Sequence, residues 1–308
     1  MYTKYSINHS YFSCIDTEEK AYILGLLYAD GCVCSTNNCI SIVFQTKDRD
    51  LLDIIKTALT STHPIKHFST YSLFNFTSKQ LKQDLITLGC VPKKSKILQF
   101  PEFLILSPLL KHFLRGYFDG DGSISSFIST TQHKNRQKQT QIKVLDCSIT
   151  SSTLFITKCS EVIKSLLNIN TCIKIPHKDK NLGDISSLDI RGRKQIKIFL
   201  DFIYSDATIK MERKYNKYLE ILNDIQIQKT ITCSKCKKPV YSDLLCNRHY
   251  NLNNRGIERD TCILCDKDTY GYVNLCKLHI DQLAYYKKIN KEEQFYIKHK
   301  ITKIKLIN

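Results

Sequence analysis

The feature that most restricts the possible folds of this chain is an internal repeat. Two apolar segments of nine residues, 23–31 (ILGLLYADG) and 114–122 (LRGYFDGDG), each contain a central glycine and end in Asp-Gly, and they lie 91 residues apart. A second match, residues 79–82 (KQLK) with 194–197 (KQIK), has an offset of 115 residues. Two copies of one unit, the second longer by 24 residues between these points, account for both matches.

The residue pattern of each copy predicts helix, two strands, helix, two strands, helix, which is an α+β fold. The first helix should start at Thr17, or at Asp16 with Glu19 completing a capping box, and the second copy's helix should start with Ser107 as N-cap and Pro108 as first helical residue. Apolar periodicity places the other elements. Strands are expected near 39–46, 71–77, 144–150 and 184–190, and helices near 48–60, 79–88, 153–167 and 194–204.

Gly25 and Gly116 lie in the middle of the two repeated segments. A glycine inside a helix costs about 1 kcal/mol relative to alanine, and this cost is tolerated where two backbones must approach closely. We therefore expect the two apolar helices to pack against each other between the copies. Gly31 and Gly122 suit the left-handed conformation that often follows a helix C-terminus.

Asp30 and Asp121 would then lie at the C-terminal ends of adjacent helices. The helix dipole disfavours an anion there, and the two carboxylates repel each other. A bound cation offsets both penalties, and carboxylates are natural ligands of Mg²⁺. A single Asp-Gly pair is ordinarily a turn, but its presence at equivalent positions of both copies favours a metal site.

Both nine-residue segments resemble the motif of the LAGLIDADG homing endonucleases, and the resemblance covers residues 11–224. It implies a monomer of two pseudo-symmetric αββαββα halves, residues 1–105 and 106–228, that together form a saddle on double-stranded DNA. Each half would place its sheet in the major groove of a long asymmetric target. Cleavage of both strands across the minor groove, with short 3′ overhangs, is the activity that the resemblance implies.

The resemblance also implies a catalytic metal site. The acid at the eighth motif position, Asp30 and Asp121 here, binds divalent metal over the scissile phosphates, so two or more Mg²⁺ ions are expected at the central interface. Gly31 and Gly122 are included as candidate ligands. Tyr28 replaces the sixth-position acid of the first copy, and that position is not a metal ligand in the family.

Family members place a lysine near each scissile phosphate. Residues 89–101 and 206–218 resemble the segments that carry it, and Lys94 and Lys214 are our candidates, with Lys96 and Lys210 as alternatives. The catalytic lysines would neutralise charge that develops on the phosphates. Plain phosphate contact or solvation is the alternative role. Arg115 replaces a small residue at the second motif position, which leaves the helix packing there open.

Much of the extra length of the second copy falls in residues 123–143, where no acid occurs between Asp121 and Asp146. Alternating runs flank a basic, amide-rich stretch, so we predict a long β-hairpin that contacts DNA; a solvated loop is the alternative. Arginine, lysine and glutamine side chains contact phosphates and base edges. The candidate DNA contacts are Gln45, Lys134, Arg136, Lys138, Gln141, Lys143, Arg191 and Arg193.

The net charge of +17 favours a polyanionic partner, with nucleic acid before an anionic membrane surface. The longest apolar run, residues 21–29, is much shorter than the roughly 20 residues of a membrane-spanning helix. Residues 1–12 show no secretory signal pattern. We therefore expect no membrane partner and a reducing intracellular location, either cytoplasm or nucleoid, or else an organelle or a virus-infected host.

Six of the 14 cysteines fall into two clusters that each end in a histidine. The two sets are Cys233, Cys236, Cys246 and His249, then Cys262, Cys265, Cys276 and His279. Each offers three thiolates and one imidazole, a complete tetrahedral set for structural zinc, so two Zn²⁺ ions are expected. A redox pair, or one site shared by both clusters, is the alternative. The other eight cysteines are expected to be small core residues.

The composition changes near residues 225–230, so residues 229–308 are expected to form a separate zinc-binding region with a basic tail. The region has 16 Lys and Arg against 8 Asp and Glu. Each cluster is too short to fold on an apolar core alone, and zinc supplies the missing stability. We interpret the region as an additional DNA-binding arm; a protein-interaction or stabilising appendage is the alternative.

The sequence thus predicts an intron-encoded, site-specific DNA endonuclease that depends on Mg²⁺. The alternative is a protein of the same fold that does not cleave, either a maturase that binds intron RNA or a DNA-binding regulator. The presence of both Asp30 and Asp121 argues against a nuclease that has lost its activity but not against a maturase. The genomic context and a cleavage assay discriminate between these functions.

Overall fold

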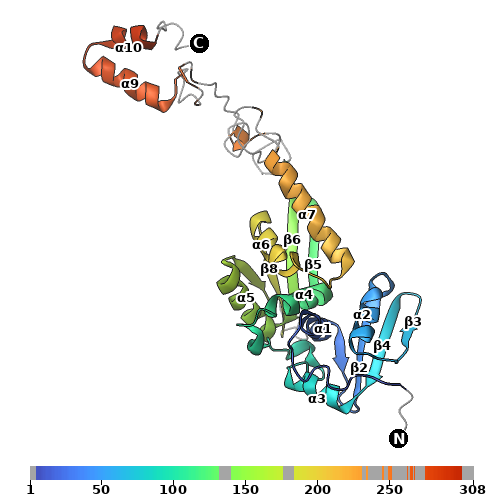
Figure 1. Ribbon diagram of the computed structural model, residues 1–308. Helices are drawn as coiled ribbons and strands as arrows, with labels where there is room; N and C mark the ends of the chain where they lie inside the picture. Colours follow the sequence, from blue (N-terminus) through green and yellow to red (C-terminus); the bar gives the residue numbers. More distant parts are fainter. Residues whose placement is uncertain are drawn as a thin grey trace. The chain divides into compact units, whose positions relative to one another are not determined.

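The chain divides into two compact units, Met1–Ile225 and Gln226–Asn308 (Figure 1). This is a computed structural model, and it describes residues 5–131, 140–175, 184–230, 234, 245, 249–251, 262, 264, 265, 267 and 275–299. None of the described helices has the length and apolar character that crossing a membrane requires.

The first half of the larger unit forms one four-stranded antiparallel sheet with the strand order β1-β2-β4-β3. Its elements are α1 (Glu18–Ala29), β1 (Gly31–Val33), β2 (Cys39–Gln45), α2 (Asp50–Ala58), β3 (Ile65–His67), β4 (Tyr71–Thr77) and α3 (Lys79–Thr87). Short 3₁₀ turns lie at Thr46–Asp48, Lys94–Lys96 and Glu102–Leu104. The observed elements follow the predicted αββαββα order.

The second half repeats this order in a sheet arranged β5-β6-β8-β7. Its elements are α4 (Leu110–Asp121), β5 (Gly122–Thr131), β6 (Thr140–Ser152), α5 (Thr153–Leu167), β7 (Thr171–Lys174), β8 (Ile185–Ile190) and α6 (Arg193–Tyr204), and α7 (Glu212–Thr230) follows. The strand pair Gly122–Ser152 spans 31 residues, whereas its counterpart Gly31–Gln45 spans 15. The predicted long hairpin is therefore present and contains most of the extra residues.

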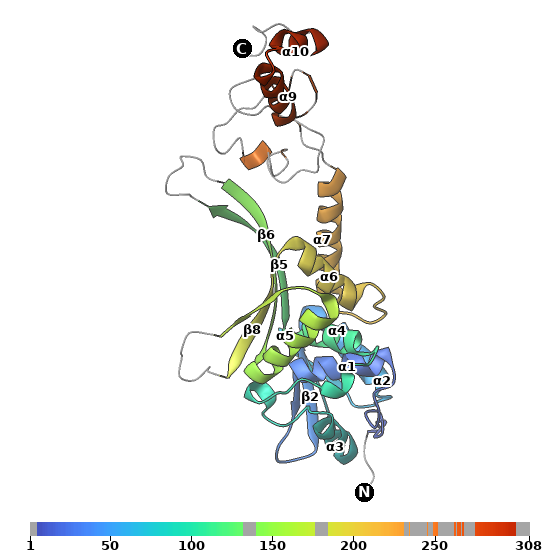
Figure 2. The ribbon, with the colours of Figure 1, turned by 90° about the vertical axis from the view of Figure 1, so that its left-hand side faces the viewer.

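Helices α1 and α4 pack backbone against backbone through their glycines. A Cβ atom on Gly25 would lie 2.2 Å from the carbonyl oxygen of Phe113, and one on Gly116 would lie 2.0 Å from that of Tyr22. No side chain fits at either contact, which confirms the interface predicted from the repeated glycines. The two helices lie side by side in both views of the molecule (Figures 1 and 2).

Two predictions about the ends of these helices are wrong. Gly31 and Gly122 are not left-handed: each begins a strand directly, and Gly122 has φ −82° and ψ 155°. Glycine is required for a different reason, since a Cβ there would lie 2.5 Å from the carbonyl oxygen of Leu27 or 2.4 Å from that of Phe118. Helix α4 starts at Leu110 and not at Pro108, because Ser107 closes a separate turn by accepting a hydrogen bond from the Leu109 amide.

Each sheet has one buried face and one open face. Along β2 the residues Ile40, Ile42 and Phe44 are buried, whereas Val43 and Gln45 between and after them are exposed. Helices cover the buried faces; in Figure 2, α4 and α6 lie on one side of β5, β6 and β8. The open faces are the surfaces that the resemblance assigns to DNA.

The smaller unit has little apolar core among its described residues. Its helices α9 (Lys277–Lys288) and α10 (Glu292–His299) pack around Leu275 and Phe295 together with Cys262 and Cys276. Two of the four residues that form this core are therefore candidate zinc ligands.

The expectation that the eight remaining cysteines are core residues is only partly correct. Cys90, Cys147 and Cys159 are buried. The other five are exposed or half-buried: Cys14, Cys32, Cys34, Cys39 and Cys172. Three of these five, Cys32, Cys34 and Cys39, lie on the β1–β2 hairpin, where they alternate with the buried residues Val33 and Ile40.

Candidate active site and candidate zinc site

Asp30 and Asp121 lie at neighbouring ends of α1 and α4, and both residues are exposed to solvent. A Cβ atom on Gly120 would lie 2.7 Å from Oδ2 of Asp30 and 2.4 Å from Cβ of Ala29. Only a glycine at this position lets the Asp30 carboxylate lie so close to the last turn of α4. The repeat thus places two acids from opposite halves at one solvent-accessible point.

The surroundings of the two carboxylates oppose their ionisation. Although each residue is exposed, protein atoms crowd its carboxyl group, and this desolvation raises the pKa of Asp30 to about 6, with a further contribution from the charge of Asp121. Desolvation also raises the pKa of Asp121. Lys94 and Lys214 act on both acids in the opposite direction. A divalent cation would favour the ionised form in the same way.

Lys94 and Lys214 bind equivalent carbonyl groups at the two helix ends. Lys94 Nζ donates to the carbonyl of Ala29 at 3.1 Å and to that of Gly31. Lys214 Nζ donates to the corresponding carbonyls of Gly120 at 3.2 Å and Gly122 at 2.6 Å. Each ammonium group therefore satisfies carbonyls on both sides of an aspartate and offsets the negative end of a helix dipole.

The alternative Lys210 makes other contacts. Its Nζ lies 3.4 Å from Glu212 and 4.6 Å from the centre of the Tyr215 ring. The geometry thus distinguishes Lys214 from Lys210. Lys214 is only 4 % exposed and also donates to the carbonyls of Phe118 and Asp119, so its ammonium group faces the protein and not solvent.

The sixth motif positions hold the lysine-bearing segments in place. Asp119 is fully buried and accepts hydrogen bonds from Tyr22, Tyr204 and the amide of Met211, three residues before Lys214. Tyr28, its counterpart, donates to the carbonyl of Leu88, which precedes the Lys94 segment. The two residues at this motif position thus each connect a motif helix to the segment that carries its lysine.

Arg115, the other departure from the motif, is buried and satisfied. Its guanidinium lies 2.5 Å from the carboxylate of Glu18 at the start of α1, and it donates to the carbonyls of Ile203 and Ile209. The same Glu18 oxygen accepts from the amide of Thr208. The arginine therefore joins α4 to the beginning of α1 instead of disturbing the helix packing.

Sequence reasoning missed a polar link at Asp121. The hydroxyl of Tyr117 lies 3.4 Å from Oδ2 of Asp121 and donates to Ser151 Oγ at 2.7 Å. These residues line a pocket of 250 Å³ that also includes Lys94, from the other half. Tyr117 stands where the first motif has Leu26, and this difference was the sequence signal for the link.

The candidate DNA contacts are only partly described. Gln45 is exposed at the end of β2. Arg191 is exposed and pairs with Asp189 at 3.3 Å, and Arg193 begins α6. Lys134, Arg136 and Lys138 lie outside the described residues. Gln141 and Lys143 are on β6, where the backbone alone is described.

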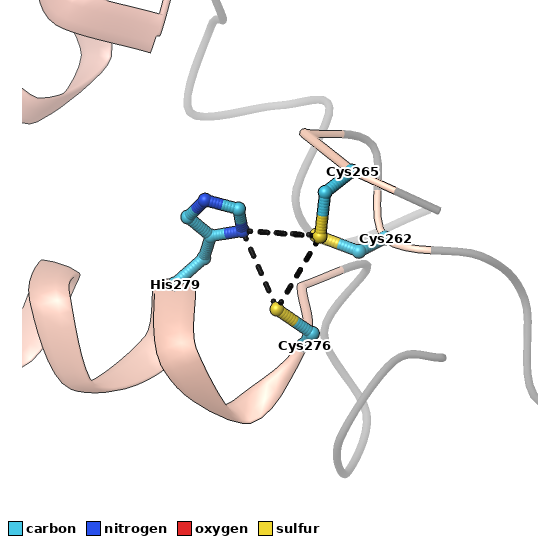
Figure 3. Close-up of side chains that lie close together, drawn as sticks. All are labelled: Cys262, Cys265, Cys276 and His279. Atoms are coloured by element: carbon cyan, nitrogen blue, oxygen red, sulfur yellow. Dashed lines mark hydrogen bonds between the residues drawn. The ribbon is translucent and has the colours of Figure 1, made fainter. Parts of the chain in front are cut away.

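The second Cys/His set forms a compact cluster (Figure 3). The ligand atoms of Cys262, Cys265, Cys276 and His279 all lie within 4.8 Å of one another. His279 Nδ1 is 3.3, 3.7 and 3.4 Å from the sulfur atoms of Cys262, Cys265 and Cys276, and the sulfurs of Cys265 and Cys276 are 3.7 Å apart.

These separations fit a tetrahedral zinc ion. Zinc–sulfur bonds of about 2.3 Å and zinc–nitrogen bonds of about 2.0 Å place sulfurs about 3.8 Å apart and sulfur about 3.5 Å from nitrogen. Cys233, Cys236 and Cys246 of the first set lie outside the described residues, and His249 of that set is buried. The structure thus brings together one of the two predicted sets.

The comparisons with known proteins agree with this architecture. Residues 109–204 match the family described as the LAGLIDADG-like domain. The second half of the chain is therefore similar to this family, and the first half repeats the same order of elements, which confirms the predicted resemblance and fold. No curated protein matches the chain.

Two similar solved structures are DNA complexes. The I-LtrWI LAGLIDADG homing endonuclease bound to target DNA has 15% identity and a TM-score of 0.48, with 72% of this chain and 93% of that one covered. The meganuclease I-SmaMI bound to uncleaveable DNA has 14% identity and a TM-score of 0.48, with 77% and 97% covered.

Proposed function

We propose that the protein is a metal-dependent endonuclease that cleaves both strands of a long, asymmetric DNA target. The observation that carries this proposal is the pair of exposed acids, Asp30 and Asp121, held side by side on glycine-packed helices with a lysine at each helix end. The charge of Asp121 disfavours the ionisation of Asp30. Two acids held in such an arrangement at an accessible position indicate a functional site and not a purely structural one.

The chemistry of these donors fits Mg²⁺. Asp30 and Asp121 would hold the ions, and bound Mg²⁺ supplies Lewis-acid activation of water for in-line displacement at phosphorus. The carbonyls of Gly31 and Gly122 already accept hydrogen bonds from lysines, so they would be secondary ligands at most. We propose that these lysines keep both carboxylates ionised and fix the helix ends; Lys94, which is only half-buried, is the better placed to contact a phosphate.

The open faces of the two sheets would bind the DNA. The exposed end of β2 with Gln45 and the long β5–β6 hairpin are the parts that we assign to the major groove. Because the two hairpins differ in length and side chains, the two half-sites would differ in sequence, which is the basis for an asymmetric target.

We further propose that the C-terminal unit binds zinc and extends the DNA footprint. The tetrahedral separations of the second Cys/His set and the excess of basic residues support this. Elemental analysis should find two zinc ions per chain. Cys276→Ser should reduce this to one and weaken DNA binding without abolishing cleavage, whereas Cys172→Ser should change neither.

A cleavage selection on randomised duplex DNA with Mg²⁺ tests the endonuclease proposal. Asp30→Asn and Asp121→Asn should abolish double-strand cleavage of the selected target and retain binding, and Asp50→Asn, an exposed acid on α2, is the control. Cleavage by both variants at the rate of the unmodified protein would refute the site. Binding of duplex DNA or intron RNA without any cleavage would favour the regulator or the maturase.

A further inference from the structure

Three cysteines gather on the open face of the first sheet. Cys32 is exposed in β1, Val33 after it is buried, and Cys34 is again open to solvent. Cys39 begins β2 on the same face, as the alternation with buried Ile40 requires. Among the described residues, the atoms of these three thiols do not form a metal-binding group, so their proximity calls for another explanation.

The register of the hairpin places Cys34 directly opposite Cys39. Val33 pairs with Ile40, and the amide of Cys34 donates to the carbonyl of Cys39 at 3.0 Å, which makes these two residues the next pair. Directly opposed residues of an antiparallel pair have Cα atoms about 4.5 to 5.5 Å apart. Those separations lie within the range found for disulfides. The backbone therefore already has the spacing that a Cys34–Cys39 bridge needs.

The surroundings of Cys34 favour its thiolate. The hydroxyl of Thr36 lies 3.5 Å from its sulfur, and this hydrogen bond, with the amides of Thr36 and Asn37, lowers the pKa of Cys34 to about 7. The ammonium group of Lys82, which donates to the carbonyl of Asn37 at 2.7 Å, acts in the same direction. Burial, followed by the negative neighbours Cys34 and Cys32, raises the pKa of Cys39. Cys34 is thus suited to attack a small disulfide, and Cys39 is suited to attack the mixed disulfide that results.

We propose that Cys34 and Cys39 form an oxidisable dithiol that reacts with a low-molecular-weight disulfide and closes the β1–β2 hairpin. The Cys34 thiolate attacks one sulfur of the small disulfide, forms a mixed disulfide and releases the first small thiolate. Cys39 loses its proton and attacks Cys34 Sγ, which releases the second. The protein loses two protons and two electrons, and the small disulfide is reduced to two thiols.

Oxidation of Cys34 and Cys39 would change the surface that we assign to DNA. The thiols share their open face with Ser41, Val43 and Gln45 of β2, the surface that we assign to DNA. A glutathione on Cys34 would add bulk and negative charge there, and the bridge would fix the hairpin. This consequence for DNA binding rests on the proposed function, whereas the thiol chemistry does not.

Mapping of the cysteine peptides tests the site without DNA. The full-length protein is treated with oxidised glutathione at pH 7 and analysed by mass spectrometry. A Cys34–Cys39 bridge that dithiothreitol reverses is the expected product. Cys39→Ser should leave glutathione attached to Cys34, Cys34→Ser should prevent the bridge, and Cys32→Ser and Cys172→Ser should retain it. An unmodified Cys34, or a disulfide from Cys39 to a cysteine other than Cys34, would overturn the proposal.

Two further measurements sharpen the test. Cys34 should react roughly threefold faster at pH 7 than the exposed Cys172, because its larger thiolate fraction outweighs its lower nucleophilicity. The oxidised protein should bind its selected DNA at least several-fold more weakly, and Cys34→Ser should lose this sensitivity. Equal affinities of the oxidised and reduced protein would reject the effect on DNA while the mapped bridge would stand.

Discussion

The C-terminal ends of α1 and α4 have the same backbone arrangement, but the side chains around Asp30 and Asp121 differ. The repeat and the strand register make Leu26 equivalent to Tyr117, and Phe44 equivalent to Ser151. In the first half this pair is apolar and buried; in the second it is a hydrogen-bonded pair that reaches Asp121. The comparison teaches that the repeat reproduces the position of an acid without reproducing its environment.

The lysines differ in the same way. Lys214 is buried and satisfies four carbonyl groups, whereas Lys94 is half-buried and satisfies two. Burial lowers the pKa of Lys214 to about 8, against the opposing effect of Asp119. The Asp121 end is thus the more rigidly connected one, and the Asp30 end is the more open.

The largest effect should come from what the halves share. Gly25→Ala or Gly116→Ala would force a Cβ into backbone atoms of the opposite helix, so each should lower the free energy of unfolding by about 3 kcal/mol or more. Urea denaturation measures this loss, and Ser41→Ala on an open face is the control. If one glycine tolerates alanine and the other does not, the interface is not the symmetric contact described above.

Replacement of the two lysines should reveal an energetic difference between the two halves. Lys214→Met would remove a charged hydrogen-bond donor from four carbonyl groups in a buried position, at a cost of about 3 kcal/mol, whereas Lys94→Met should cost about 1 kcal/mol because water can replace the ammonium group. Denaturation of both variants gives the difference. Equal losses would show that the burial of Lys214 has no energetic consequence.

Tyr117→Phe removes the hydroxyl that contacts Asp121 and leaves the ring in place. Under the proposed function we expect cleavage of one DNA strand to slow by about tenfold, equivalent to about 1.4 kcal/mol, while cleavage of the other strand is unchanged. Strand-specific nicking rates on an end-labelled duplex measure this. Leu26→Met is the matched control in the first half. A uniform slowing of both strands would indicate a structural defect instead of a positioning role.

The smallest effect concerns the charge of Asp30. Its pKa in the folded protein is about 6 against an ordinary 3.8, so the folded state binds the proton more tightly. Stability from this group is therefore lost as the pH rises from about 4 to about 6. In the absence of divalent metal, Asp30→Asn should raise the melting temperature by roughly 1–3 °C at pH 7.5, a small gain because the side chain is exposed, and should have no effect at pH 4. A lower melting temperature of Asp30→Asn than of the unmodified protein at pH 7.5 would contradict the conclusion that the charge of Asp30 is unfavourable.

Local patterns predicted the fold well because they depend on near neighbours. The helix expected near residues 153–167 is Thr153–Leu167, and Thr17 caps α1 through the amide of Lys20. The resemblance selected Lys94 and Lys214 from among close alternatives, and the structure brings both to the helix ends.

The features that the sequence did not predict are those that depend on contacts between residues distant in the chain. The link from Tyr117 to Ser151 joins residues 34 positions apart and depends on how α4 lies on β6, which no periodicity specifies. The role of Gly31 likewise depends on the strand that starts immediately after α1, since the steric limit is the preceding helical turn and not a left-handed backbone. The scattered cysteines were predicted as one group of core residues, whereas Cys32, Cys34 and Cys39 lie on the open face of the first sheet.

The ion pair of the buried Arg115 with Glu18 favours the association of unlike halves over like ones. The repeat makes Leu24 the counterpart of Arg115 and Leu109 the counterpart of Glu18, so the equivalent pair of positions is apolar. A first half paired with its own copy would confine a carboxylate against leucine, and a second half paired with itself would confine an unmatched guanidinium. Such unpaired charges penalise the wrong assembly. If the chain were cut between its halves, each fragment should therefore pair with the other in preference to a second copy of itself.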